Sequence, residues 1–141
     1  MISRRHFATL LSALWAAPAG LAAESGVLPA RVYPFSKLPV RAGAHSQFRP
    51  VFQGKTHTGF PIELHETLLE PGASPHPPHH HAHEEIFLVR EGSVEVTING
   101  ESTTIGPGSV AYMASNVQHG VRNTGSAAAQ YFVMALGNQQ A

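Results

Sequence analysis

The sequence predicts an all-β fold, an antiparallel sandwich or barrel of short strands in a single domain. From Phe60 onward the chain is a series of apolar or alternating runs, each of strand length, separated by Gly, Pro or Asn. Asn99-Gly100 is a favoured two-residue hairpin turn, because both residues accept a positive φ angle. After the N-terminal apolar stretch, no window has the apolar spacing of a long amphipathic helix.

Six strands are expected along this part of the chain. They are residues 62–69, 85–90, 94–98, 109–113, 118–122 and 130–136. In the clearest of them, Val94, Val96 and Ile98 alternate with polar residues, which is typical of a strand with one buried face and one solvated face. The barrel is therefore predicted at 56–137, with a tail at 138–141.

Residues 1–23 have the features of an export signal. Two adjacent arginines, Arg4 and Arg5, precede an apolar stretch at 8–17 that is too short to span a bilayer as a stable helix, and two alanines at 22–23 follow like a cleavage region. Ser-Arg-Arg-x-Phe resembles the twin-arginine type, whose export machinery accepts folded cargo. An ordinary secretory signal and an uncut membrane anchor are the alternatives. The twin-arginine interpretation predicts a periplasmic protein of a bacterium, with no membrane attachment after cleavage.

Cleavage would leave about 118 residues, enough for one domain with a modest core. The loss of Arg4 and Arg5 leaves seven basic and nine acidic side chains, a net charge of −2 with neutral histidines. No nucleic acid is expected as a partner, because no excess of positive charge remains to attract phosphates. The chain has no cysteine, which excludes a disulfide framework and a thiolate metal site.

Residues 24–55 are predicted to form a proline-rich N-terminal arm. They contain four prolines and show no sustained helical or alternating period. A free tail would not need the apolar side chains at 32–35 and 48–52, so the arm should lie against the barrel or against a second subunit. A disordered linker is the alternative for 24–40. Arm exchange between two barrels would cover an unpaired strand edge, so a homodimer is compatible with this pattern.

The histidine-rich segment that begins at His76 contains donors for a metal site. His79 and His81 are two residues apart, so in an extended strand both imidazoles can point to the same side. Glu85 opens the next apolar run and can add an oxygen donor, and His119 is the candidate for a fourth ligand. Two nitrogens and one carboxylate oxygen suit Fe(II), Mn(II), Ni(II), Cu(II) or Zn(II) and do not suit Ca(II).

The same residues resemble the first motif of the cupins. That motif consists of Gly, five residues, His-x-His, three or four residues, Glu, six residues and Gly. His79, His81, Glu85 and Gly92 fit these spacings, whereas Gly72 lies one residue too far upstream.

The second cupin motif consists of Gly, five residues, Pro-x-Gly, two residues, His, three residues and Asn. Gly108, His119 and Asn123 fall at the expected spacings, with Ala114 in place of the proline and Asn116 in place of the glycine. Asn is the next best residue where a turn requires a positive φ angle.

The resemblance covers roughly residues 60–136, and both motifs occur in the family's order. It implies a jelly-roll β-barrel that binds one divalent transition metal. The ligands carried over from the family are His79, His81, Glu85 and His119.

The other histidines have less specific interpretations. His80 should point away from its two neighbours, into solvent or a loop. His83 is an alternative ligand, and His76 is expected at the mouth of the barrel rather than on the metal. His65 and His57 are expected to face the cavity or solvent without a role. A histidine-rich loop that binds metal loosely is the alternative to the whole site.

Phe87 and Val89 follow Glu85 at even spacing and would form an apolar wall beside the metal. Open coordination positions on the metal would permit dioxygenase-like or related chemistry on a small organic substrate. A non-catalytic module that binds metal or a small molecule is the alternative, because this fold hosts many activities. If the chain folds before export, its metal is selected in the cytoplasm, which favours Mn or Fe over Zn, Ni or Cu.

Overall fold

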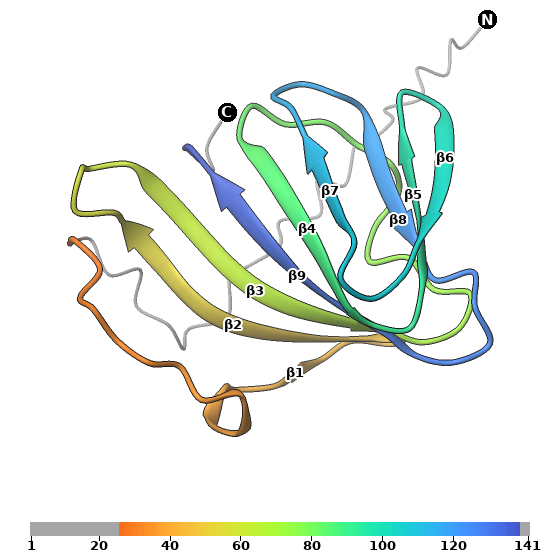
Figure 1. Cartoon of the computed structure of the whole chain (residues 1–141), viewed down its shortest axis with the longest axis horizontal. Helices are drawn as coiled ribbons and strands as arrows, with labels where there is room; N and C mark the ends of the chain where they lie inside the picture. The colour runs from red at the N-terminus through yellow and green to blue at the C-terminus, as the bar shows by residue number, and fades with distance from the viewer. Residues whose placement is uncertain (1–25, 139–141) are drawn as a thin grey trace, which may run out of the picture.

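The computed structural model describes residues 26–138, which form two antiparallel β-sheets (Figure 1). The larger sheet has the strand order β1-β2-β3-β9-β4-β7, and the smaller has the order β6-β5-β8. The elements are the 3-10 helix η1 (Phe35–Lys37) and the strands β1 (Arg41–Ala42), β2 (Ser46–Lys55), β3 (Pro61–Leu69), β4 (Glu84–Glu91), β5 (Val94–Ile98), β6 (Glu101–Ile105), β7 (Val110–Met113), β8 (His119–Arg122) and β9 (Ala129–Leu136). The predicted all-β, antiparallel fold is confirmed.

The predicted export signal lies outside the described residues. Within residues 26–138, no helix is both long and apolar enough to cross a membrane.

The six strands predicted from the sequence are present, each within one residue of its expected ends. Strand β6 was missed, because its first four side chains are polar and exposed and give no apolar alternation. It pairs with β5 across the predicted hairpin turn, where Asn99 and Gly100 have φ angles of 49° and 86°. The expected alternation in β5 is also found: Val94 and Val96 are buried, and the polar residues between and after them are half-buried.

The predicted arm at 24–55 is incorrect in its last part. Ser46–Lys55 forms β2, which pairs with β3 along its length, and Arg41–Ala42 forms β1, which pairs with β2. The sheet therefore begins at Arg41, well before the predicted boundary at residue 56. Pro50 had argued against a strand here. The structure places Pro50 at a register shift between Pro50 and Phe52, and such an irregularity tolerates a residue that cannot donate a ladder hydrogen bond.

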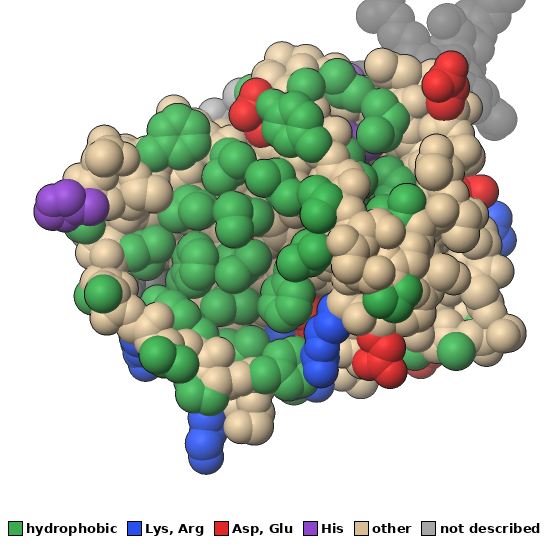
Figure 2. Space-filling view, viewed as in Figure 1, with side chains coloured by type: hydrophobic (Ala, Val, Ile, Leu, Met, Phe, Trp, Pro, Cys, Tyr) green, Lys and Arg blue, Asp and Glu red, His purple; other side chains and the backbone are tan. Residues whose placement is uncertain are grey.

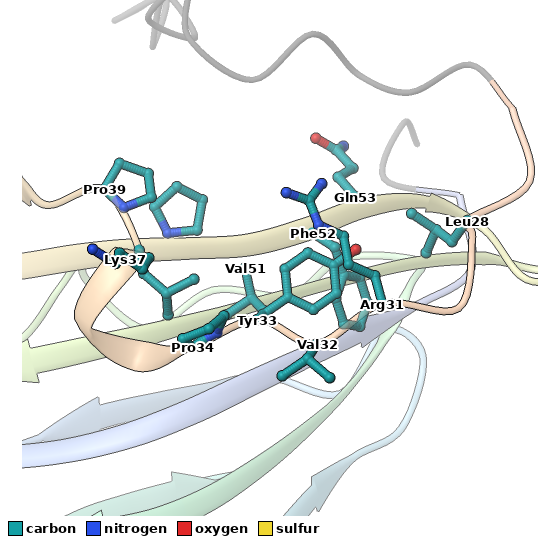
Figure 3. Close-up of a pocket in the computed structure, with 12 residues that line it drawn as sticks. Leu28, Arg31, Val32, Tyr33, Pro34, Lys37, Pro39, Val51, Phe52 and Gln53 are labelled. Atoms are coloured by element: carbon teal, nitrogen blue, oxygen red, sulfur yellow. The ribbon is translucent and has the colours of Figure 1, made fainter.

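The rest of the arm, residues 26–40, lies against β2 of its own chain and is called the strap below (Figure 3). The amide of Leu28 donates to the carbonyl of Lys55 at 2.8 Å. The ring centroids of Tyr33 and Phe52 are 5.5 Å apart, and both residues line a pocket of about 190 Å³ between the strap and β2. One of the two expected docking modes of the arm, contact with the barrel, is therefore found.

The hydrophobic core is formed by side chains from both sheets. It contains Leu69, Phe87, Val89, Met113, Ala129, Tyr131 and Val133 from the larger sheet and Val94, Val96 and Val121 from the smaller. The core buries the inner face of each sheet. The candidate site lies between the two sheets, beside the core.

Candidate metal centre

His79 and His119 are joined through their backbones, although forty positions separate them in the sequence. The amide of each residue donates to the carbonyl of the other at 2.9 Å. The amide of Asn116 donates to the carbonyl of His81 at 2.8 Å and adds a second link. Asn116 has a φ angle of 60°, in agreement with its place at a glycine position of the second motif. These links hold the histidine-rich segment against the start of β8.

Three imidazoles converge on one space. The ring centroids of His79, His81 and His119 are 4.8 to 5.0 Å apart, and one nitrogen from each ring lies within 4.8 Å of the other two. Among the described residues, Nδ1 of His79 and Nε2 of His81 and His119 are buried without a hydrogen-bond partner. A buried nitrogen without a partner costs free energy unless a cation or a water binds its lone pair. The cluster could therefore hold a metal ion.

In two of these histidines, a hydrogen bond fixes the protonation state of the second ring nitrogen. Nδ1 of His81 lies 2.8 Å from the carbonyl oxygen of His83, and Nδ1 of His119 lies 2.8 Å from that of Val117. Because a carbonyl can only accept, each Nδ1 must donate a proton, and the neutral ring keeps its lone pair on Nε2. This is the tautomer that a metal ligand requires.

Glu85 reaches the cluster from β4. Its Oε2 lies 3.3 Å from Nε2 of His119, and its Oε1 lies 3.5 Å from Nε2 of His81. Burial alone would raise the pKa of Glu85, but the neighbouring imidazoles, His119 first among them, outweigh burial and lower the pKa to about 2. The carboxylate is therefore charged at neutral pH and faces two of the unpartnered nitrogens.

The pKa values of two of these histidines shift in opposite directions. Burial, together with the neighbouring His76 and His119 rings, lowers the pKa of His79 to about 4, so this ring is neutral at pH 7. The interaction with Glu85 instead raises the pKa of His119. A metal ligand must be deprotonated, so metal binding should release any proton that His119 holds beside Glu85.

His83 also contacts this cluster. Its ring is stacked on that of His81, with centroids 3.5 Å apart and an interplanar angle of 6°. Its Nε2 lies 3.4 Å from Oε1 of Glu85. His81, His83 and Glu85 thus form a second, overlapping set of donors within 4.8 Å of one another, and His83 stays an alternative ligand.

The remaining histidines follow the expectations in part. His80 and His57 are exposed, and His76 packs edge-on against His79 with ring centroids 4.1 Å apart. His65 lines the cavity beside the cluster, one of its two expected placements, and a neighbouring glutamate holds its Nδ1 at 2.9 Å.

A cavity of about 160 Å³ adjoins the cluster, and Glu85 and His119 line part of it. Its other walls are mainly apolar and include Phe48, Phe87, Tyr131 and Val133. The predicted wall is confirmed for Phe87. It is wrong for Val89, which faces the core like Phe87 but does not line this cavity. Sequence reasoning also missed Tyr131, because β9 is apolar on both faces and its pattern does not show which residues point inward.

The sequence matches the model of a known protein family. The family model described as "Cupin domain" matches residues 65–135, half of the chain. The chain belongs to the cupin family.

Several solved structures share this fold. KdgF from Halomonas sp. has a TM-score of 0.65 at 18% identity, over 79% of this chain and 97% of that chain. An RmlC-like cupin from Shewanella frigidimarina has a TM-score of 0.63 at 16% identity, over 75% and 89%. The polyketide cyclase RemF from Streptomyces resistomycificus has a TM-score of 0.63 at 19% identity, over 81% and 83%. No curated protein sequence matched significantly. At these identities the likeness shows the fold alone.

The asparagine of the second cupin motif supports the fold. Asn123 is fully buried, and its amide group donates to the carbonyls of Leu69 at 3.0 Å and Ala127 at 2.8 Å. Its Oδ1 accepts from the amide of Gly125 at 2.9 Å. Asn123 therefore holds the loop between β8 and β9 against the end of β3.

Proposed function

We propose that this cupin is an exported, metal-dependent enzyme that acts on a small organic substrate in the periplasm. The observation that carries the proposal is a cluster of unpartnered imidazole nitrogens beside a cavity that His119 and Glu85 line. Metal-binding donors in a closed interior could serve only the stability of the fold. Donors that line a cavity are accessible to a substrate. The proposed ligands are His79, His81, Glu85 and His119, with His83 as the alternative.

A divalent transition metal with four protein ligands would keep one or two coordination positions open and supply Lewis-acid or redox chemistry. Mn or Fe is favoured, because folding before export would select the metal in the cytoplasm; Zn, Ni and Cu are the alternatives. Elemental analysis can compare protein exported through its own signal with the same chain secreted unfolded. Identical copper or zinc contents in the two preparations would contradict this choice.

The protein's own side chains would orient the substrate and exclude water. Phe87, Tyr131 and Val133 offer an apolar surface close to Glu85, so an apolar or aromatic part of the substrate can pack there. A carboxylate or hydroxyl of the same molecule would then point toward the donor cluster. The hydroxyl of Tyr131 is protonated at neutral pH like that of an ordinary tyrosine, and burial raises its pKa further, so it can donate a hydrogen bond.

Dioxygenase-like oxidation is the reaction to test first, and a non-oxidative reaction, such as the cyclisation for which RemF is named, is the second. A non-catalytic module that binds metal or a small ligand is the competing function. The small cavity favours the binding module, because a volume of about 160 Å³ admits only a small part of most organic substrates without movement of the walls.

The experiment incubates metal-loaded protein with a panel of phenolic and carboxylate compounds, with and without oxygen. Oxygen uptake and the masses of the products are measured. His119→Ala removes a proposed ligand, and His80→Ala is the matched control because that side chain is exposed. We expect turnover in the wild type and the control and its loss in His119→Ala. Tight metal binding without turnover of any compound would favour the binding module.

A further inference from the structure

The inner face of β3 carries polar side chains beside the cavity. Glu63, His65 and Thr67 alternate along this face, and Leu69, the next residue of the row, belongs to the core. Figure 2 shows the opposite side of the larger sheet covered mainly by hydrophobic side chains. A charged residue on an inner face has a desolvation cost that a hydrogen bond or an ion pair must offset. The row therefore indicates a specific arrangement and not a solvated surface.

Glu63 and His65 form a hydrogen-bonded dyad on this face. Nδ1 of His65 lies 3.0 and 2.9 Å from the two carboxylate oxygens of Glu63. The side chains of His65 and Glu63 are only 17% and 14% exposed, so water screens their contact in part. Because a carboxylate only accepts, Nδ1 donates its proton, and the neutral ring keeps its lone pair on Nε2. Glu63 therefore sets which nitrogen of His65 can accept a proton.

The ring of His65 presents this nitrogen to the cavity. His65 lines the cavity, and Glu63 lies at the next inward position toward the start of β3. Nδ1 points to Glu63, so the opposite edge of the imidazole, which carries Nε2, faces the cavity. Phe48 of β2 packs against the ring, with centroids 4.4 Å apart and an interplanar angle of 35°. A histidine that is held in this way is positioned to accept a proton from a bound molecule.

The dyad faces the donor cluster across one strand. Ala135 of β9 pairs with Glu63 of β3 on one side and with Glu85 of β4 on the other. Two strand spacings separate β3 from β4, so their backbones lie roughly 10 Å apart. His65, Glu85 and His119 line the same cavity. A molecule of one ring between β3 and β4 would therefore contact the dyad at one end and the donor cluster at the other.

The walls of the cavity suit an aromatic ring with an acidic hydroxyl group. Phe48, Phe87 and Tyr131 line the cavity, and its volume of about 160 Å³ favours a compact molecule. The lone pair on Nε2 complements an O–H donor. An ordinary imidazole has a pKa of about 6.5 and a plain phenol one of about 10. Full transfer of the proton therefore requires a phenol or enol whose acidity an electron-withdrawing group has raised.

We propose that Glu63 and His65 are the proton-accepting dyad of this cavity, and that the dyad binds a small phenol or enol of raised acidity as its anion. The O–H bond breaks, its electron pair stays on the oxygen, and the lone pair of Nε2 forms the new N–H bond. The imidazolium then lies between the carboxylate of Glu63 and the new oxyanion. Return of the proton to the oxygen restores the neutral ring, so the step needs no other reactant.

This inference rests on the proposed function in that the substrate occupies the same cavity, but the proton transfer itself requires no metal. The probe is 4-nitrophenol, whose neutral and ionised forms absorb at different wavelengths. The full chain, loaded with zinc or treated with a chelator, is titrated at a pH where the free probe is mostly un-ionised. Absorbance measures the ionised fraction and calorimetry measures the affinity. We expect both preparations of the wild type to bind the probe in its ionised form.

Two variants separate the members of the dyad. His65→Gln removes the nitrogen that accepts the proton, and the ionised probe should bind at least about tenfold more weakly, because a charge-assisted hydrogen bond is lost. Glu63→Gln keeps an acceptor for Nδ1 but removes the negative charge, so the bound probe should be less ionised. His57→Gln is the matched control and should behave as the wild type, because His57 is exposed in the turn before β3.

Urea unfolding checks that each variant is folded, and Glu63→Gln carries the test if His65→Gln does not fold. A wild type that leaves the probe unbound, or binds it un-ionised, would overturn the proposal. Ionisation that is confined to the zinc-loaded protein and unchanged in His65→Gln would also overturn it, because the metal would then ionise the phenol. A purely structural pair would change the free energy of unfolding without changing the ionisation of the probe, and this result would overturn the proposal as well.

Turnover of the compound panel by metal-loaded protein is measured separately. Ionisation of the probe without turnover of any compound would contradict the proposed enzyme and support the dyad. Turnover by a protein that does not ionise the probe would contradict the dyad and support the enzyme.

Discussion

Gly120 and Pro78 are in contact so close that a Cβ atom on Gly120 would lie 3.1 Å from Cγ of Pro78. Gly120 directly follows His119 in β8, and Pro78 directly precedes His79. The contact therefore fixes the separation between two proposed ligands. A side chain larger than hydrogen at position 120 would force the Pro78 ring to move by a few tenths of an ångström or more.

Gly120→Val should weaken metal binding about tenfold and lower the free energy of unfolding by about 1–3 kcal/mol, the usual cost of overpacking. Metal titration and urea unfolding measure the two effects. Gly106→Val is the control, because a Cβ atom there meets no heavy atom within 4 Å. Equal metal affinities in the two variants would show that the Pro78 contact does not position the ligands.

Asn123→Leu should destabilise the protein without removing the metal. The change deletes three hydrogen bonds and leaves the carbonyls of Leu69 and Ala127 without their side-chain partner. We expect a loss of about 2–4 kcal/mol in the free energy of unfolding. Chemical denaturation and the metal content of the folded fraction check this, with Thr104→Val as an exposed control. Loss of metal at unchanged stability would assign Asn123 to the site instead.

The apolar and alternating residue patterns of the strands made much of the fold predictable. The alternation in β5 gave correct bounds for that strand, because Val94 and Val96 are buried, and Asn99-Gly100 marked the turn that follows it. The polar strand β6 gave no such signal. Pro50 made β2 hard to predict, because a proline normally argues against a strand interior. The register shift that accommodates Pro50 depends on the pairing of β2 with β3.

Only the part of the candidate site that follows from the residue spacing of the motifs was predictable. The motif spacings identified the histidines that the structure brings together, and Asn116 adopts the expected positive φ angle. The stacking of His83 on His81 was not predictable, because it depends on the path of the backbone between His81 and β4. Tyr131 was missed for a related reason: both faces of β9 are apolar, so only the packing of the two sheets decides which side lines the cavity.

The metal-free protein should lose stability as the pH falls from about 6.5 to about 4. The pKa of His79 is about 4 in the folded protein, below its ordinary value of 6.5, so the unfolded chain binds a proton in this window and the folded chain does not. The full contribution is present above pH 6.5, and about 2 kcal/mol is lost by pH 4 once solvent screening is allowed for. Urea unfolding of chelator-treated protein at pH 7 and pH 4.5 measures the loss.

His79→Gln should flatten this part of the pH profile. The lowered pKa of His83 adds to the loss and the raised pKa of His119 opposes it, and both contributions remain in His79→Gln. Glu85 does not interfere, because its folded pKa of about 2 lies below its ordinary 4.5, and its contribution is present above pH 4.5 and lost only as the pH falls further toward 2. A variant with the same slope as the wild type between pH 6.5 and 4.5 would show that another group carries the effect.

Replacement of both Arg4 and Arg5 by Lys should retain the protein in the cytoplasm of a bacterial host. A twin-arginine receptor reads the guanidinium pair, whereas an ordinary secretory signal needs only positive charge and would tolerate the exchange. Fractionation followed by immunodetection measures the distribution. The control replaces Arg31 and Arg41, which lie beyond the proposed signal, by Lys. Normal export of the doubly substituted signal would favour the ordinary secretory route.

The metal content of three proteins tests most directly whether two distant parts of the chain bind one ion. The wild type and His80→Ala should each hold about one divalent transition metal per chain, because His80 is exposed. His119→Ala should bind the metal more than about 100-fold more weakly, since the loss of a ligand should cost more than the 10–100-fold typical of a supporting residue. Equal metal content and affinity in His119→Ala and the wild type would contradict the account.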